Sequence, residues 1–362
     1  MNHTLRIIAD KVRRAERIGA DEALCLQSAP LELLGQLAAE AKRRASGDKV
    51  FYNRNFHIEP TNICAFNCRF CSYRRPKGSP EAWEYTIEQM EESVRSRLGR
   101  GFTEVHIVGG VHPERDTAYY AELIRRIRAL MPEAAVKAFT AVELAYMFRK
   151  SGLTTHEGLE MLASAGMTAI PGGGAEIFDE QLRSRICPEK GTAAEWLAVH
   201  DAAHRMGIRT NATILYGHVE TFEQRIDHLD RLRRQQDLTG GFDAFIPLKF
   251  RSRGNMLSHA GEVSADEDMR MLALSRIYLD NIPHIKAYWV MYGKQTAERA
   301  LGFGADDLDG TIDDSTRIYS MAGADDSRPT MTIAEIHAMA RRAGLRAVER
   351  DTHYNEITRH EL

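Results

Sequence analysis

Three cysteines in one short segment constrain this chain more than any other feature of its sequence. Cys64, Cys68 and Cys71 are separated by three and by two residues, in the stretch Ile-Cys-Ala-Phe-Asn-Cys-Arg-Phe-Cys at 63–71. Cysteine thiolates are the usual ligands of iron–sulfur clusters, and an electron carrier supplies four of them. Three thiolates can bind three irons of one cubane cluster. The spacing therefore predicts a fourth iron without a protein ligand, open to a substrate or cofactor.

A zinc site and a disulfide framework are the alternatives to a cluster. Zinc sites use four Cys or His ligands at short spacing, and the nearest histidines, His57 and His106, do not complete such a pattern. The chain has five cysteines in 362 residues, whereas disulfide scaffolds are small and dense in cysteine. Cys25 and Cys187 have no ligand spacing, so we interpret them as ordinary thiols.

Composition and charge argue against several classes of partner. The 48 basic and 51 acidic residues give a net charge of -3, which provides no general attraction to nucleic acid or to an anionic membrane. No apolar run approaches the roughly 18 residues of a membrane span, and the N-terminus lacks the apolar core of a signal peptide. We therefore expect small-molecule partners and a cytoplasmic protein, which also suits an oxygen-sensitive cluster.

Short apolar runs alternate with amphipathic helices from about residue 50 onward, after a stretch at 1–48 with helical spacing. Helices are predicted, for example, at 118–130 and 222–234. Strands are predicted at 50–58, 104–108, 136–140, 167–170, 209–215, 245–250, 285–290 and near 307–309.

Repeated strand–helix units imply parallel strands joined by right-handed crossovers. We therefore predict an α/β fold, a (β/α)8 TIM-type barrel with an N-terminal helical extension. The extension would cover 1–48, the barrel core 49–310, and a C-terminal segment packed on the barrel 311–362.

Polar and glycine-rich loops follow most of the predicted strands. In a barrel of this kind, the loops at the carboxyl ends of the strands carry the chemistry. A glycine run alone is more often a turn, and the glutamates in these loops could instead be favoured by a helix N-terminus. Taken together, the loops predict a pocket at that end of the barrel. They are Gly-Gly-Val-His-Pro at 109–113, Thr-Ala-Val-Glu at 140–143, Pro-Gly-Gly-Gly-Ala-Glu at 171–176 and Tyr-Gly-His-Val-Glu at 216–220.

Several independent motifs resemble those of the aminofutalosine synthase family of the radical S-adenosylmethionine (SAM) superfamily. The resemblance extends from about residue 50 to the end of the chain. It implies a radical SAM barrel, a 4Fe–4S cluster held by Cys64, Cys68 and Cys71, and SAM consumed as co-substrate. The motifs lie at 57–64, 108–113, 137–143, 171–178, 210–220, 239–248, 280–289 and 304–310.

Two related families share the cluster motif, the triple glycine and the Gly-His-Val-Glu loop. They are dehypoxanthine futalosine cyclase and the deazaflavin-forming (FO) synthase. Asn211, Tyr216, Leu248 and the stretch 137–140 favour the aminofutalosine synthase. The alternative outside this class is a noncatalytic iron–sulfur protein.

The resemblance also implies a reaction and its partners. The enzyme would add the 5'-deoxyadenosyl radical from SAM to 3-[(1-carboxyvinyl)oxy]benzoate, with rearrangement and decarboxylation, to give aminodeoxyfutalosine for menaquinone biosynthesis. An electron donor such as flavodoxin or ferredoxin would reduce the cluster. A homodimer is one alternative for the assembly.

Candidate site residues follow from the resemblance and from the loops. Tyr73 would support the adenine through its main chain, and Gly109 and Gly110 would approach the methionine ammonium. The substrate carries two carboxylates, which need cationic or hydrogen-bond-donating partners. The further cofactor candidates are His112, Thr140, Glu176, Asn211 and Glu220, and the catalytic or substrate candidates are His57, Lys137, His218 and Arg251.

Overall fold

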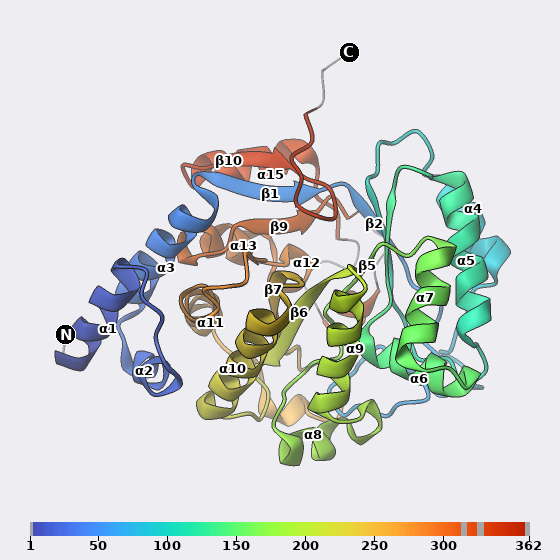
Figure 1. Ribbon diagram of the computed structural model, residues 1–362, viewed down its shortest axis with the longest axis horizontal. Coiled ribbons are helices and arrows are strands. Elements are labelled where there is room, and N and C mark those ends of the chain that lie inside the picture. The colour runs from blue at the N-terminus through green and yellow to red at the C-terminus, as the bar shows by residue number, and fades with distance from the viewer. Residues whose placement is uncertain (1–2, 313–316, 324–328, 359–362) are drawn as a thin grey trace.

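Seven parallel strands form the central sheet of the protein, whose computed structural model describes residues 3–312, 317–323 and 329–358 (Figure 1). The strands lie side by side in the order in which they occur along the chain, so each connection returns over the outside of the sheet. The predicted α/β barrel class is confirmed. The strands are β2 (Asn55–Ile58), β3 (Glu104–Ile107), β4 (Ala135–Ala138), β5 (Ala169–Ile170), β6 (Arg209–Tyr216), β7 (Phe242–Lys249) and β8 (His284–Ile285).

Amphipathic helices cover the outer face of this sheet (Figure 1). Most begin at a Ser, Thr or Asp whose side chain accepts a hydrogen bond from the first turn, such as Thr86 and Asp116. The helices are α4 (Ile87–Arg95), α5 (Thr117–Leu130), α6 (Ala141–Ser151), α7 (Thr155–Ala165), α8 (Glu180–Ile186), α9 (Ala193–Arg205), α10 (Phe222–Thr239), α11 (Ala265–Tyr278), α12 (Trp289–Tyr292) and α13 (Lys294–Ala300), with 3-10 turns η2 (Pro188–Lys190), η3 (Ser258–Ala260) and η4 (Leu301–Phe303).

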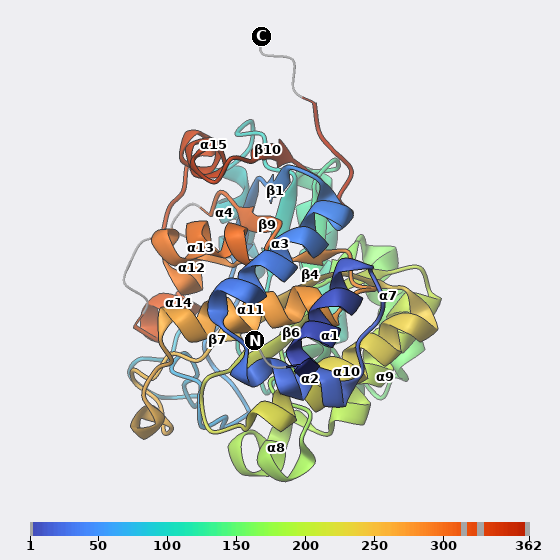
Figure 2. The same ribbon diagram turned by 90° about the vertical axis from the view of Figure 1, so that its left-hand side faces the viewer.

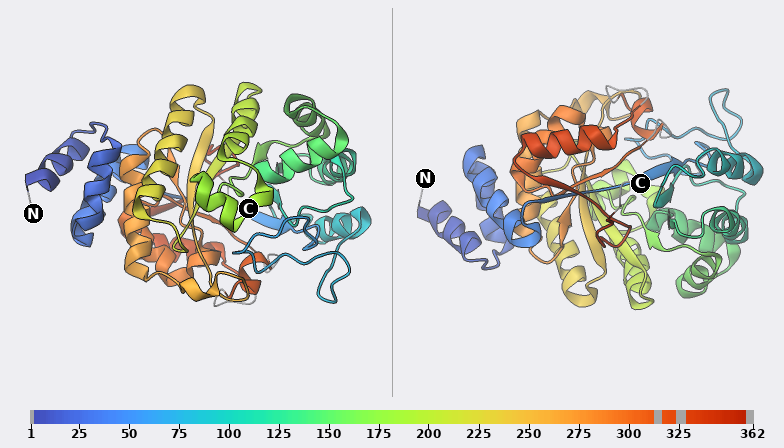
Figure 3. Two further views of the ribbon diagram at one scale, coloured as in Figure 1. Left: turned by 90° about the horizontal axis from the view of Figure 1, so that it is seen from below. Right: turned by 90° about the horizontal axis from the view of Figure 1, so that it is seen from above.

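A second, three-stranded parallel sheet lies at one end of the barrel beside α15 (Ile333–Arg342), as the right-hand view of Figure 3 shows. Its order is β10 (Arg346–Glu349), β1 (Lys49–Asn53) and β9 (Asp307–Gly310). β9 is the strand predicted near 307–309. It pairs along β1 and meets β8 through one bridge, between Lys286 and Asp307.

Two strand predictions differ from the structure. The stretch 50–58 is two strands, β1 and β2, which belong to different sheets. In the stretch 285–290, β8 ends at Ile285 and one bridge follows at Lys286, because the chain turns into α12 at Trp289.

The N-terminal extension is helical, as predicted, and packs on the outside of the barrel helices (Figure 2). It consists of α1 (His3–Arg13), α2 (Ala20–Cys25), the turn η1 (Leu26–Ser28) and α3 (Leu31–Ser46). α3 lies against α11 with Leu34 and Leu37 fully buried, and α2 lies against α10.

The C-terminal residues close the barrel at the starts of its strands. Arg350 is fully buried and lies 2.7 Å from the carboxylate of Asp307, and the Thr352 hydroxyl donates to Glu104 at the start of β3. The opposite end, where the strands finish, is left for the site. The domain boundaries at 48 and 310 stay predictions.

Within the described ranges, no helix is both long and apolar enough to cross a membrane.

Candidate active site

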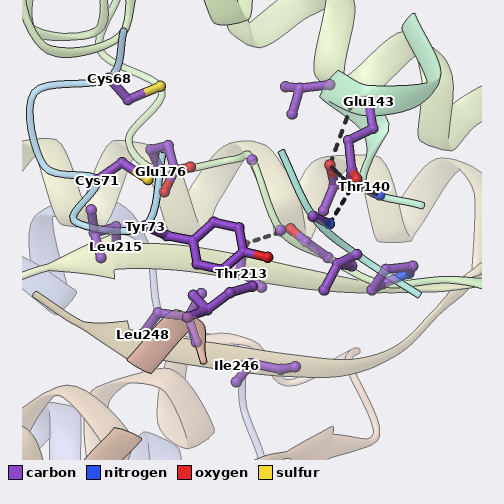
Figure 4. A pocket seen from close by; sticks show the side chains of 18 of the residues that line it. Cys68, Cys71, Tyr73, Thr140, Glu143, Glu176, Thr213, Leu215, Ile246 and Leu248 are labelled. Carbon is purple, nitrogen blue, oxygen red and sulfur yellow. Dashed lines mark hydrogen bonds between the residues drawn. The ribbon is translucent and has the colours of Figure 1, made fainter. Parts of the chain in front are cut away.

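One pocket opens at the carboxyl ends of the central strands and reaches down between them (Figure 4). Its outer part is formed by the cysteine loop and the glycine loops, and its floor by side chains from the strands themselves. Twelve of the predicted site residues line it. They are Cys64, Cys68, Cys71, Tyr73, Gly109, Gly110, Thr140, Glu176, Asn211, His57, Lys137 and Arg251.

The cysteine loop is fixed by hydrogen bonds to three other segments. The amide of Cys64 donates to Arg75 O at 3.0 Å, that of Ala65 to Val111 O at 2.8 Å, and that of Arg69 to Ile186 O at 2.8 Å. The amide of Val111 also donates to the Cys64 sulfur at 3.4 Å. Hydrogen bonds to sulfur of this kind are one means by which proteins tune iron–sulfur clusters.

The three sulfurs fit a cluster better than a single metal ion. In the part of the chain that the structure describes, no three His, Cys, Asp or Glu side chains converge closely enough to hold one ion. A zinc ligand set must converge in that way, whereas each cysteine of a cubane binds a different iron. Burial raises the pKa of the Cys64 and Cys68 thiols, so both need a bound metal or a nearby cation to ionise.

The glycines of two loops are required by close backbone packing. The amide of Gly110 donates to Thr61 O at 2.8 Å, and a Cβ atom on Gly110 would lie only 2.3 Å from Ile63 O. A Cβ atom on Gly172 would lie 2.6 Å from Asn211 O. These glycines therefore hold the cysteine loop and the triple-glycine loop against the strand ends.

Glu143 is a buried carboxylate of the pocket, for which the sequence allowed either a pocket role or one at a helix N-terminus (Figure 4). It accepts hydrogen bonds from the amide and hydroxyl of Thr140, at 2.8 and 2.5 Å, and from the amide of Gly109 at 3.1 Å. Burial raises the pKa of Glu143 to about 7, although these hydrogen bonds favour the charged form.

Lys190 lies beside the cysteine loop and forms a buried ion pair with Glu176. Burial is the largest single influence and opposes the charged form of Lys190, but the Glu176 carboxylate together with Cys68 and Cys187 raises the Lys190 pKa above its ordinary value. Lys190 was not among the predicted site residues, because it lies in the turn η2 and not directly after a strand, and no motif contains it.

The floor of the pocket is a cluster of charged and imidazole side chains on neighbouring strands. His57, His106 and Lys137 stand at one level, since His57 pairs in register with His106 and His106 with Lys137. Lys137 lies 2.8 Å from Glu104, and Lys286 lies 2.5 Å from Asp309.

His106 and Lys286 were not among the predicted site residues. Burial lowers the pKa of His106 to about 3, so its ring is neutral. Alternation along β3 could have identified His106, because a strand directs every second residue to the same face and Glu104 also lines the pocket.

Three predicted site residues lie outside the pocket lining, and their contacts give the reason. His112 Nδ1 accepts from the amides of Glu114 and Arg115, at 3.1 and 3.2 Å, so this ring closes a turn. Glu220 accepts from the amide of Gly217 at 2.6 Å.

The other contacts of the turn at 217–220 also join residues that are close in sequence. Glu220 lies 2.8 Å from the Arg225 guanidinium, and the His218 Nε2 is 3.1 Å from Leu215 O. His112 also lies 3.2 Å from the Glu84 carboxylate, outside its own turn. Roles for His112, His218 and Glu220 in binding SAM or substrate stay predictions.

Comparisons with known proteins define the class. Residues 58–232 match the radical SAM superfamily, and residues 239–361 match the CofH/MqnC C-terminal region. The fold resembles methylornithine synthase PylB, with a TM-score of 0.75 and 17% identity over 94% of this chain and 97% of that one. It also resembles the FeFe-hydrogenase maturase HydG of Carboxydothermus hydrogenoformans, with a TM-score of 0.73 and 16% identity over 97% and 80% of the two chains. Fold and family together define a radical SAM enzyme, which uses a 4Fe–4S cluster and takes SAM as co-substrate.

Relatives of higher identity narrow the class to a family. The chain is 42% identical to the aminodeoxyfutalosine synthase of Thermus thermophilus over 97% of its length and 95% of the relative. It is 37% identical to the aminodeoxyfutalosine synthase of Streptomyces coelicolor, over 98% and 95%. It is also 38% identical to the 5-amino-6-(D-ribitylamino)uracil–L-tyrosine 4-hydroxyphenyl transferase of Methanoculleus marisnigri, over 97% of both chains. The chain belongs to the radical SAM family that includes the aminodeoxyfutalosine synthases, as the motifs predicted.

Proposed function

We propose that this protein is an aminodeoxyfutalosine synthase, which joins SAM to 3-[(1-carboxyvinyl)oxy]benzoate in menaquinone biosynthesis. The observation that carries the proposal is the 42% identity to the Thermus thermophilus enzyme over nearly the whole of both chains. The reaction needs a one-electron donor, for which a flavodoxin or a ferredoxin is suitable.

The pocket offers a separate region for each part of such a reaction. Cys64, Cys68 and Cys71 would hold the cluster at the outer end, where bound SAM supplies the 5'-deoxyadenosyl radical. Leu215, Ile246 and Leu248 line the middle, as Figure 4 shows for their side chains. An aromatic ring seated on this apolar wall would be kept from water, and the adjacent alkene would be held towards the cysteine loop.

The floor supplies donors for a carboxylate of the substrate. Lys137 and Lys286 each have one carboxylate partner, which leaves further N–H donors on each ammonium. His57 faces the same space, and Arg251 lies elsewhere in the pocket lining. We infer that the floor binds one carboxylate of the substrate and that Arg251 meets the other.

The fate of the adenosyl group tests the proposed reaction. In an anaerobic reaction with SAM labelled on its adenosyl carbons, we expect the label in a covalent adduct with the benzoate, because the radical adds to the alkene. Mass spectrometry of the products measures this. Recovery of the label chiefly as free 5'-deoxyadenosine, with the benzoate unchanged, would contradict the proposal.

A second candidate is the aryl transfer reaction named for the archaeal relatives. It is favoured by the 38% identity to the Methanoculleus marisnigri transferase, which also extends over nearly the whole of both chains. Incubation of the protein with 5-amino-6-(D-ribitylamino)uracil, tyrosine and SAM tests it. Turnover of this pair, without turnover of the enolpyruvyl benzoate, would replace our proposal. The same experiment includes a third incubation, with dehypoxanthine futalosine and SAM, in which cyclisation of that substrate would identify the cyclase activity.

We also propose that Glu143 accepts a hydrogen bond from the methionine amino group of SAM, since its carboxylate lies beside Gly109 in the pocket. A charged acceptor contributes about 1.5–3 kcal/mol, so Glu143→Gln should weaken SAM binding at pH 8 by roughly tenfold or more. Because the pKa of Glu143 is raised to about 7, its carboxyl group is charged above that pH and increasingly neutral below it. The ratio of the SAM dissociation constant of Glu143→Gln to that of the parent protein should therefore shrink as the pH falls through about 7.

Glu157 provides the matched control for this variant. It makes the same contacts at the start of α7, where the amide and hydroxyl of Thr154 donate to it at 2.8 and 2.7 Å, but it is exposed and outside the pocket. Glu157→Gln should leave SAM binding unchanged. A dissociation constant that is equally altered in both variants, or in neither, would reject the role of Glu143.

A further inference from the structure

Lys190 is a buried cation on the cluster side of the pocket that neither the fold nor the proposed chemistry explains. Its side chain is 13% exposed, and that of its partner Glu176 is 8% exposed. A buried ion pair is weak evidence of a contribution to stability, because the desolvation of both charges offsets their attraction. Stability alone therefore does not account for this buried ion pair.

The ammonium group of Lys190 lies close to the ligand loop. Its Nζ atom stands 5.3 Å from the centre of the Phe70 ring, and Phe70 lies between Cys68 and Cys71 in the sequence. Lys190 is the last residue of η2, and the residue before this turn, Cys187, is fully buried. The backbone bond from Arg69 to Ile186 ties this segment to the ligand loop.

Lys190 lines the same pocket as the three cysteines. Its ion pair with Glu176 is almost completely buried, so little water lies around the ammonium group to screen its charge. A fixed positive charge therefore lies beside the segment that carries the ligands.

Glu176 is held in place by an unusual backbone. Its φ angle of +52° lies in the left-handed region, which residues other than glycine rarely adopt. Its carbonyl oxygen accepts a hydrogen bond from the amide of Leu215 at 2.8 Å, which fixes the loop to β6. The carboxylate is thereby placed where it keeps Lys190 buried and charged.

We propose that Lys190 sets the reduction potential of the cluster, and that Glu176 acts through Lys190 as its counter-charge. A cubane with three thiolate ligands carries one net negative charge when oxidised and two after it accepts one electron. A fixed cation nearby stabilises the reduced form more than the oxidised one, and net charge near a cluster is a known determinant of its potential. The position of Lys190 thus makes the first step of radical formation, reduction of the cluster, more favourable.

A redox titration of the reconstituted protein without SAM or substrate tests this role, with dithionite as the one-electron source and the paramagnetic signal of the reduced cluster as readout. At the midpoint potential of the parent, Lys190→Met should lower the ratio of reduced to oxidised cluster about tenfold, which for one electron corresponds to about 59 mV. Glu176→Gln should shift the ratio in the opposite direction, because it leaves the Lys190 charge without its counter-charge. Lys190→Arg should stay close to the parent.

Lys286→Met is the matched control. Lys286 is also a buried, ion-paired lysine of the same pocket, but it pairs with Asp309 at the pocket floor, whereas Lys190 lies against Phe70 of the cysteine loop. Its substitution should leave the potential unchanged. Equal potentials in the parent, Lys190→Met and Glu176→Gln would overturn the proposal, and so would shifts of the same sign in the two variants. If Lys190→Met takes up no cluster, the shift in Glu176→Gln alone decides. No product is measured, so the outcome is independent of which reaction the enzyme catalyses.

Discussion

Replacement of Cys68 by alanine should abolish both the iron-dependent absorption of the reconstituted protein and all cleavage of SAM. Only three cysteines line the pocket within the described residues, and three are the minimum that holds a cubane with one open iron. Loss of one ligand leaves a second iron without a protein ligand. We expect activity to fall by more than about a thousandfold, as is typical when an essential catalytic group is removed. Iron content, visible absorption and release of methionine from SAM measure the effect.

Cys25 and Cys187 are the controls for this variant. Cys25 lies at the end of α2, far along the chain from the pocket, and Cys187 is fully buried but does not line the pocket. Both alanine variants should keep the cluster and the activity. Loss of iron from Cys187→Ala alone would show that this thiol is a fourth ligand, and full activity in Cys68→Ala would remove the assignment of the cluster ligands.

Local patterns predicted the repeated units of the fold, but not which strands pair with which. The stretch 50–58 contains no glycine or proline, so nothing in the sequence marks the break at Arg54 between β1 and β2. The break arises from distant parts of the chain, because β9 and β10 pair with β1 whereas β3 pairs with β2. The two partners of β1 lie more than 250 residues away along the chain and leave no local trace in a single sequence.

Motif position picked out the loops that form the outer part of the pocket, but not which of their glutamates line it. Glu220 directly precedes the Thr221 cap of α10, and the structure uses it to hold the turn through Gly217 and Arg225. Glu143 instead stands in the first turn of α6, three residues after its cap Thr140, and it also accepts a hydrogen bond from Gly109 in the pocket. Both glutamates adjoin a helix N-terminus, and only the packing of neighbouring loops separates the one that faces the pocket from the one that does not.

The floor of the pocket was only partly predictable for a different reason. His57 and Lys137 were found because they belong to recognised motifs, whereas His106 stands between them in the sheet and belongs to none. Register brings the three side chains to one level, and register depends on pairing rather than on any one strand. Lys286 is harder still to identify as a floor residue from the sequence, because the strand that it follows, β8, is only two residues long.

A methyl group on Gly110 should displace the cysteine loop. This effect would add to any loss of SAM binding that follows if Gly110 approaches the methionine ammonium, as the resemblance implies. The added Cβ atom would lie 2.3 Å from Ile63 O, so the backbone of one segment must move. The amide of Gly110 also donates to Thr61 O, and Thr61 and Ile63 immediately precede the first ligand, Cys64. Forced repacking of this kind typically costs about 1–3 kcal/mol, so Gly110→Ala should reduce cluster loading and SAM cleavage by about tenfold or more.

Gly302 is the matched control, because it also has an ordinary φ angle but a Cβ atom there would meet no neighbouring atom within 4 Å. Gly302→Ala should load the cluster and cleave SAM as the parent does. Circular dichroism of both variants shows whether the barrel itself is intact, and iron content then reports on the loop alone. A folded Gly110→Ala protein with full iron content and undiminished SAM binding would mean that the cysteine loop yields to the added methyl group, and that the glycine is not needed to hold the ligands in place.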